Sequence, residues 1–231
     1  MGALVALALL ANVFLSPRPE APQRNRFVVD IPRRQSHMES AAAALLALSP
    51  DGERLVYVAA SDESRMLYLR QLGEFEANAI AGTEGALTPF FSPDGDWIGF
   101  YANGFLQKVP VGGGTPIVIC ESVRVRGATW GADDTIVFTT GLPSVLNGVS
   151  AAGGQPETLQ TPDEANHTTA AFLPVGNQVL YGISDADMID ADVIKVLSLE
   201  SGEAHAVYRM EPRGRQTRFV SSGGESDGHL V

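Results

Sequence analysis

Residues 46–59 read LALSPDGERLVYVA, which places a tight-turn signal directly in front of a dense apolar run. Serine, proline and glycine at positions one, two and four are typical of a β-turn, so residues 49–52 predict a turn. The run Leu55-Val56-Tyr57-Val58 is β-branched and aromatic and too short for a helix. The stretch therefore predicts two strands joined by a turn, the second with both faces buried.

The same pattern returns at intervals of about 40 residues. Its further copies are FFSPDGDWIGFYA at 90–102, ATWGADDTIVFTT at 128–140 and AAFLPVGNQVLYGI at 170–183. Each copy continues with an outward segment that ends in a glycine-containing turn, and then with a short fourth segment. Four strands in a period of about 40 residues predict the blade of a β-propeller, with the turn motif joining the first two strands.

The predicted fold is an all-β propeller of four-stranded antiparallel blades. Four blades are complete, and TRFVSSGGESDGHLV at 217–231 supplies the first hairpin of a fifth. Proline and glycine recur inside every unit, which argues against a helical repeat of similar period. Trp97 and Trp130 are expected to be buried between blades. Because four blades and a hairpin leave a propeller unclosed, we interpret the chain as a fragment of a larger protein.

The N-terminus differs from the repeats. Residues 1–15, MGALVALALLANVFL, are nearly all apolar and predict a short helix, and residues 16–26 form a proline-rich linker before the propeller at 27–231. Fifteen helical residues rise about 22 Å, short of the roughly 30 Å of a bilayer core. We therefore expect the C-terminal part of a transmembrane helix; a degenerate signal peptide and a buried segment are the alternatives.

Composition narrows the classes of partner. The net charge of −11, without a basic cluster, argues against nucleic-acid binding. Cys120 is the only cysteine, which excludes an intrachain disulfide and a cysteine-based metal site, and we expect it to be a small buried hydrophobe.

Three motifs resemble catalytic or ligand-binding sequences but are better explained as turns or loops. Ser226 lies in a G-x-S-x-G pattern at 224–228, yet a nucleophile elbow needs a following helix and later acid and histidine partners, whereas this position is that of a hairpin turn. DADMIDAD at 185–192 lacks the glycine and glutamate of an EF-hand and predicts a solvated loop. The glycines at 112–114 lack a following Gly-Lys-Ser/Thr and predict a turn. We predict no catalytic residue, no metal and no cofactor.

Three polar side chains are candidates for ligand binding. Arg124, Arg126 and His167 come just before the innermost strands of the third and fourth blades, which places them at one end of the central channel. Ligands commonly meet a propeller there, although a channel mouth is also where polar loop residues are solvated.

The repeat resembles that of a known family. SPDG followed by an apolar strand, with VPVGGGTP at 109–116 and SAAGGQPETL at 150–159, is similar to the TolB-type, WD40-like propeller repeat over residues 27–231. The run TEGALTPFFSPDGDWIGFYANGFLQKVPVGGGTPIVIC at 83–120 looks like the propeller that follows the transmembrane helix of bacterial membrane-bound serine/threonine kinases. The chain itself contains no kinase motif, so any kinase activity would belong to residues outside it.

The resemblance implies a non-catalytic sensing or protein-interaction domain of a membrane-anchored, kinase-like receptor. Its partner would be a protein or peptide, it would reach the membrane through the N-terminal apolar segment, and the propeller would be extracytoplasmic, in the periplasm. One pattern disagrees with that orientation, because the positive-inside rule would place the arginines after the apolar segment in the cytoplasm. These arginines are Arg18, Arg24, Arg26, Arg33 and Arg34.

Two other functions remain open. The chain could be the gating propeller of a prolyl-oligopeptidase-like serine peptidase, which would require an α/β-hydrolase domain after residue 231. It could also be a free periplasmic TolB-like scaffold, which would require a cleavable signal peptide in place of the apolar start.

Overall fold

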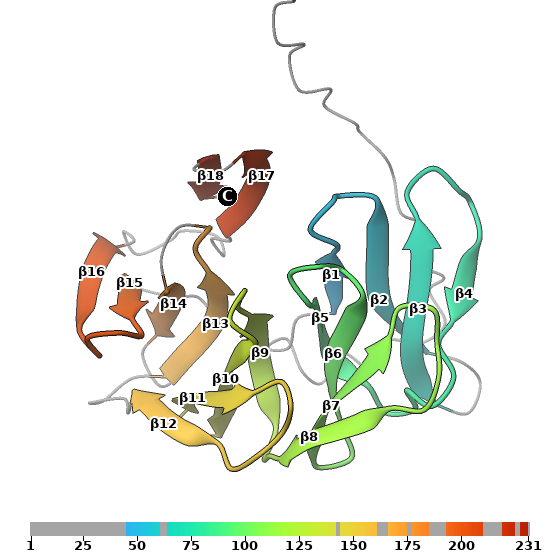
Figure 1. Cartoon of the computed structure of the whole chain (residues 1–231), viewed down its shortest axis with the longest axis horizontal. Helices are drawn as coiled ribbons and strands as arrows, with labels where there is room; N and C mark the ends of the chain where they lie inside the picture. Colours follow the sequence, from blue (N-terminus) through green and yellow to red (C-terminus); the bar gives the residue numbers. More distant parts are fainter. Residues whose placement is uncertain are drawn as a thin grey trace, which may run out of the picture. The chain divides into compact units, whose positions relative to one another are not determined.

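A computed structural model describes residues 45–60, 64–141, 144–160, 166–174, 177–184, 193–209, 219–224 and 227–230. Within these residues the protein is all-β, and its strands form four four-stranded antiparallel sheets and one two-stranded hairpin (Figure 1). The predicted four blades and start of a fifth are thereby confirmed. The predicted N-terminal helix and linker lie outside the described residues.

Each sheet follows the chain order, with the first strand at one edge and the fourth at the other. Sheet 1 comprises β1 (Leu46–Leu48), β2 (Arg54–Ala60), β3 (Arg65–Gln71) and β4 (Ala77–Ala79). Sheet 2 comprises β5 (Leu87–Phe91), β6 (Trp97–Ala102), β7 (Phe105–Pro110) and β8 (Ile117–Glu121). Sheet 3 comprises β9 (Val125–Trp130), β10 (Thr135–Gly141), β11 (Ser144–Ser150) and β12 (Glu157–Gln160). Sheet 4 comprises β13 (Asn166–Phe172), β14 (Gln178–Ser184), β15 (Val193–Ser198) and β16 (Ala204–Arg209), and the hairpin comprises β17 (Phe219–Gly224) and β18 (Asp227–Leu230).

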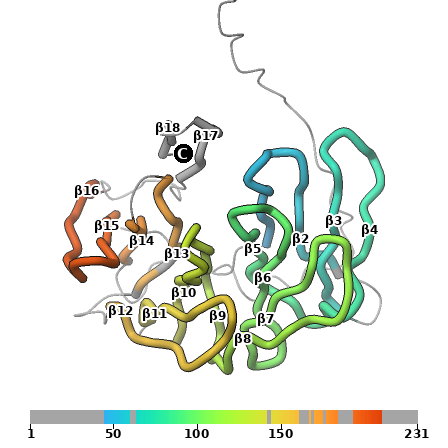
Figure 2. The backbone as a smooth tube through the Cα atoms, in the orientation of Figure 1, coloured from blue at the N-terminus to red at the C-terminus, as the bar shows by residue number. Residues whose placement is uncertain are grey.

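The first strands of successive sheets lie next to one another. β1 contacts β5, β5 contacts β9, and β9 contacts β13. Each sheet then runs outward from this inner strand through three further antiparallel strands, a path that the backbone tube repeats from sheet to sheet (Figure 2). This arrangement makes β5, β9 and β13 the inner strands of three propeller blades.

The hydrophobic core lies between successive sheets. Phe100 and Val56 are fully buried between sheets 1 and 2, and Val137 and Leu146 are fully buried between sheets 3 and 4. The sheets present apolar residues on both faces because the second strand of each sheet is packed on both sides. A single blade could not bury either face alone, which is why the repeats stabilise one another.

Both tryptophans pack against the core between sheets 2 and 3. Trp130 is 7% exposed, which confirms its predicted burial, whereas Trp97 is only partly buried. Cys120 belongs to this core, is 5% exposed, and has a thiol pKa that burial raises. The prediction that it is a buried hydrophobe is confirmed.

A lysine joins sheets 2 and 3 at this core. The Lys108 Nζ lies 4.8 Å from the ring centre of Trp97 and 5.7 Å from that of Trp130. It also donates a hydrogen bond of 2.8 Å to the carbonyl oxygen of Ala151. The ammonium group is therefore held by two aromatic rings of neighbouring sheets and a backbone carbonyl.

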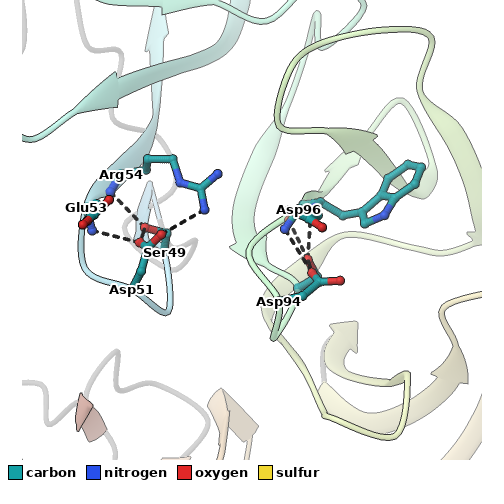
Figure 3. Close-up of polar contacts among 8 residues, drawn as sticks. Ser49, Asp51, Glu53, Arg54, Asp94 and Asp96 are labelled. Atoms are coloured by element: carbon teal, nitrogen blue, oxygen red, sulfur yellow. Dashed lines mark hydrogen bonds and ion pairs between the residues drawn. The ribbon is translucent and has the colours of Figure 1, made fainter.

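The SPDG turns are closed by side chains as well as by the backbone. In the first turn the Ser49 hydroxyl donates to Asp51 and accepts from the Arg54 amide at 2.9 Å, while Asp51 also accepts from the Glu53 amide (Figure 3). In the turn of sheet 2, Ser92 donates to Asp94 and accepts from the backbone amide of Trp97 at 2.9 Å. These hydrogen bonds explain why serine and aspartate recur at the same two positions.

The turn carboxylates are stabilised as anions by these bonds. Hydrogen bonds from the serine hydroxyl and then from a backbone amide lower the pKa of both Asp51 and Asp94 below the ordinary value. The glycines that end the two turns, Gly52 and Gly95, have φ angles of 71° and 74°, a region that favours glycine. The serine, aspartate and glycine of SPDG are thus each fixed by a separate physical requirement.

Replacing Ser92 by alanine is expected to lower the free energy of unfolding by about 1 kcal/mol, because it removes the acceptor of the Trp97 amide and the donor to Asp94. Urea denaturation followed by tryptophan fluorescence measures the change. Ser122, whose hydroxyl donates to the adjacent Val123 carbonyl, is the matched control, and its alanine variant should lose less than about 0.5 kcal/mol. Equal losses in the two variants would contradict the role assigned to the turn serine.

In sheets 2, 3 and 4, the turn between the third and fourth strands contacts the outer edge of the preceding sheet. The Gly154 amide of sheet 3 donates to the carbonyl oxygen of Ile119 in β8 at 3.2 Å. Gln160 of β12 donates through Nε2 to the carbonyl oxygen of Gly202 in sheet 4 at 3.2 Å. A Cβ atom on Gly82, just after β4, would lie 2.8 Å from Pro116 of sheet 2. These contacts cover edges that would otherwise offer unpaired backbone groups.

Within the described residues, no helix is both long and apolar enough to cross a bilayer. The apolar segment that predicts a membrane helix, residues 1–15, lies outside them.

Candidate ligand-binding site

The inner strands of sheets 2, 3 and 4 each carry a β-bulge near their start. In every case the inner strand has one residue more than the partner segment of the second strand. The extra residues fall at 88–89 of β5, at Arg126 of β9 and at 168–169 of β13. Bulges break the regular alternation of side chains and re-aim them, and they are common beside functional sites. The three bulges therefore define the candidate site.

The first bulge contains a residue in an unusual conformation. Thr88 has a φ angle of 52°, is 1% exposed, and donates through Oγ1 to the carbonyl oxygen of Val125 at 3.2 Å. A β-branched residue at positive φ is strained, so its neighbours must hold it in place. The hydrogen bond ties the bulge of sheet 2 to the first residue of β9 in sheet 3.

The second bulge places a positive charge in a partly buried position. Arg126 is half-buried, and its Nε atom is buried without a hydrogen-bond partner in the structure. Burial, and then the charge of nearby Arg124, lower the pKa of the Arg126 guanidinium. Arg124 precedes β9 and is exposed. The two arginines therefore form a concentration of positive charge in a chain whose net charge is −11.

His167 occupies a different environment. Its side chain is 2% exposed and contacts the Tyr181 ring edge-on, with 5.2 Å between ring centres. His167 pairs with Ile183 in sheet 4, as Val125 pairs with Thr140 in sheet 3. The histidine therefore occupies the position at which the preceding blade has a buried valine. Its buried Nδ1 atom has no hydrogen-bond partner among the described residues, and its backbone carbonyl accepts a hydrogen bond from Ser144.

The structure thus separates the three candidate residues. Arg124 and Arg126 lie close together at the beginning of β9, whereas His167 is a core residue of sheet 4. Sequence reasoning placed all three just before the inner strands, but Arg126 and His167 lie within β9 and β13. It also missed Thr88. The Thr88-Pro89 pair was the available signal, because proline cannot donate to a strand ladder and often marks an irregularity.

Burial makes the His167 environment sensitive to pH. Burial, and then the charge of Lys195, lower the His167 pKa below its usual 6.5. As the pH falls through about 6.5, the unfolded chain therefore binds a proton at His167 that the folded chain does not. The contribution of neutral His167 to stability is complete above about pH 6.5, and it is lost as the pH falls toward the lower folded pKa. One proton limits the slope to about 1.4 kcal/mol per pH unit.

We therefore expect urea denaturation to give a lower free energy of unfolding at pH 5.5 than at pH 7.5. This difference should be smaller in His167→Val. Val125 shows that this position accepts valine in sheet 3. Exposed His205, whose Nε2 lies 3.8 Å from Glu203, is the control, and His205→Gln should keep the full pH dependence. An unchanged slope in His167→Val would refute the assignment.

The remaining motifs are partly described. Gly224 and Asp227 pair at the end of the antiparallel hairpin β17–β18, so the G-x-S-x-G pattern connects two strands, as predicted. Ser226 itself and the aspartates of 185–192 lie outside the described residues. The glycines at 112–114 follow β7, and the Gly113 amide closes a turn onto the Pro110 carbonyl at 2.8 Å, again as predicted. Among described residues, no three His, Cys, Asp or Glu side chains gather closely enough to hold a metal ion.

Comparison with known proteins identifies the fold. No family model and no curated protein matches the sequence. TolB from Acinetobacter baumannii matches with a TM-score of 0.60 and 15% identity, over 77% of this chain and 47% of that one. A chain of the mitotic checkpoint complex matches with a TM-score of 0.61 and 15% identity, over 90% of this chain and 62% of that one.

An enzyme shares the architecture as well. Oligogalacturonate lyase from Vibrio parahaemolyticus matches with a TM-score of 0.51 and 14% identity, over 77% of this chain and 66% of that one. The chain thus spans less than two thirds of the length of each of these three structures. It has the fold of a TolB-type β-propeller, and similar folds occur in a protein complex and in an enzyme.

Proposed function

We propose that this chain is a non-catalytic β-propeller that binds a protein or peptide partner, as the sensing domain of a membrane-anchored bacterial receptor of the serine/threonine-kinase type. The observation that carries the proposal is the TolB-type arrangement of four sheets, whose inner strands bring bulges from three blades to one end of the propeller. Rigid blades that present irregular inner segments suit recognition, because the partner meets a surface that is already ordered.

The position of the propeller relative to a membrane is part of the proposal. The apolar residues 1–15 and the proline-rich linker at 16–26 support an anchor followed by a stiff spacer, with the propeller in the periplasm. Fusing alkaline phosphatase or β-galactosidase after Val231 tests this orientation. An active phosphatase fusion supports it, whereas an active β-galactosidase fusion would place the propeller in the cytoplasm, as the arginines after residue 15 predict.

The coding sequence on either side of the chain tests the kinase association. A kinase domain encoded in frame before Met1 supports the receptor. An α/β-hydrolase domain encoded in frame after Val231 would replace it with the gating propeller of a peptidase, and the absence of both would favour a free scaffold.

Site-specific cross-linking in cells tests protein binding directly. A photoreactive amino acid at exposed Arg124, beside the inner strand β9, is expected to form an adduct with a discrete partner. The same amino acid at Phe75, which is 97% exposed between β3 and β4 of sheet 1, is the control and should form none. No adduct from position 124, or equal adducts from both positions, would contradict binding at the inner strands.

We expect the purified chain to show no hydrolysis of ester or peptide substrates above background, with or without Ser226→Ala. A serine in a connection between two antiparallel strands lacks the strand–turn–helix setting that exposes and activates a nucleophile. A rate that disappears in Ser226→Ala would overturn the non-catalytic assignment and favour the peptidase.

A further inference from the structure

Among the residues that the structure describes, no opposite charge acts on Arg126 and its buried Nε atom has no hydrogen-bond partner. The guanidinium is instead affected by its burial and by the positive charge of Arg124. Burying a charged donor without an acceptor costs free energy, and a neighbouring like charge adds to that cost. An arrangement of this kind is stabilised when an anion supplies the missing acceptor.

The backbone around Arg126 is held firmly. Val125 is 1% exposed in the core between sheets 2 and 3, and its carbonyl accepts the Thr88 hydrogen bond. On the other side the Gly127 amide donates to Thr139 Oγ1 at 3.1 Å. The backbone of the bulge residue is therefore held at both neighbours, and it does not have to be ordered at the moment of binding. Preorganisation of this kind increases affinity by lowering the entropy cost.

The bulge interrupts the alternation of side chains at Arg126, since Val125, Ala128 and Trp130 all pack against the core between sheets 2 and 3. The guanidinium group of an arginine is a planar fork of donors, which matches the two oxygens of a carboxylate.

We propose that Arg126, assisted by Arg124, binds a carboxylate group of the protein partner at the bulge of β9. This inference rests on the proposed function and specifies the chemistry of the partner: an acidic side chain or a chain terminus that is received at the inner strands. A nucleic-acid phosphate is disfavoured because the chain carries a net charge of −11.

Arginine side-chain NMR provides a direct test on the whole chain. The probe is tetraglutamate with both ends blocked, and blocked tetraglutamine is the uncharged control, at an ionic strength of about 0.15 M to screen general repulsion. The expected result is a saturable shift of the Arg126 Nε–H signal with tetraglutamate and none with tetraglutamine. Arg70 is the matched control, because its Nε already donates to the Glu74 carbonyl at 2.8 Å, and its signal should stay in place.

Two variants measure the contribution to binding. Arg126→Met, which keeps an apolar stem, should weaken tetraglutamate binding at least tenfold, whereas Arg70→Met should change it less than twofold. An Arg126 signal that does not move, or an Arg70 signal that moves equally, would overturn the proposal. A larger shift with inorganic phosphate than with acetate at equal concentration would overturn the assignment to a carboxylate.

The outcomes also separate this inference from the proposed function. A cross-link at position 124 together with an unmoved Arg126 signal would refute the carboxylate contact and leave protein binding supported. A shifted Arg126 signal without any cross-link would support an anion site and refute the protein-binding role.

Discussion

Replacing Phe100 by alanine is expected to lower the free energy of unfolding by about 3–5 kcal/mol, the usual cost of removing a buried aromatic ring. Phe100 is fully buried in β6, in the core between sheets 1 and 2. The loss combines the transfer of the ring to water with a cavity that two rigid sheets cannot close. Urea denaturation monitored by far-ultraviolet circular dichroism measures the change in midpoint.

The chain supplies its own control for this experiment. Phe75 is 97% exposed, so Phe75→Ala removes the same atoms without leaving a cavity and should change stability by less than about 0.5 kcal/mol. Comparable midpoints in the two variants would show that the core between sheets 1 and 2 does not support the fold as described.

Adding a single methyl group at Gly99 is expected to cost about 2–3 kcal/mol, because overpacking a filled core forces side chains from their preferred positions. A Cβ atom at this position would lie 2.1, 2.3 and 2.7 Å from three atoms of the Phe90 ring. Gly99 and Phe90 are directly paired across β6 and β5, so the ring covers the glycine and has to move before alanine fits. Thermal and urea denaturation of Gly99→Ala both measure the effect.

A second substitution shows whether the ring is the cause. Phe90→Leu removes the contacting ring atoms, so the double variant should lose less than the sum of the two single variants. Gly112→Ala is the control, since a Cβ atom there meets nothing within 4 Å, and its stability should change by less than about 0.5 kcal/mol. Strict additivity in the double variant would contradict the packing of Phe90 on Gly99.

The sequence predicted the blades well because their signals are local. WIGFYA at 97–102 coincides with β6, since a turn motif precedes it and β-branched and aromatic residues fill it. The four-strand order followed from the repeat itself, because each unit supplies the same succession of strands and turns. The N-terminal segment was also interpreted from local composition, and its membrane role stays a prediction.

The candidate site was only partly predictable, because it depends on strand register. The residues around Arg126 do not reveal that β9 has one extra residue between Val125 and Gly127. A bulge is decided by the packing of the neighbouring sheets. Arg126 and His167 looked alike in the sequence, as polar residues just before the inner strands. Aligning His167 with Val125 and Ala86, both buried, would have identified it as a core residue.

The glycine turns that cover the outer edges give the propeller a direction. Sheet 3 covers the edge of sheet 2 through Gly154, and sheet 4 covers the edge of sheet 3 through Gly202, so each blade is protected by the one made after it. On the ribosome, a newly emerged blade would therefore keep an open strand edge until the next blade has been synthesised and folded. A pause within a blade prolongs the time during which the previous edge can pair with another nascent chain. Selection on this protein is thus expected to act on the timing of translation as well as on the final contacts.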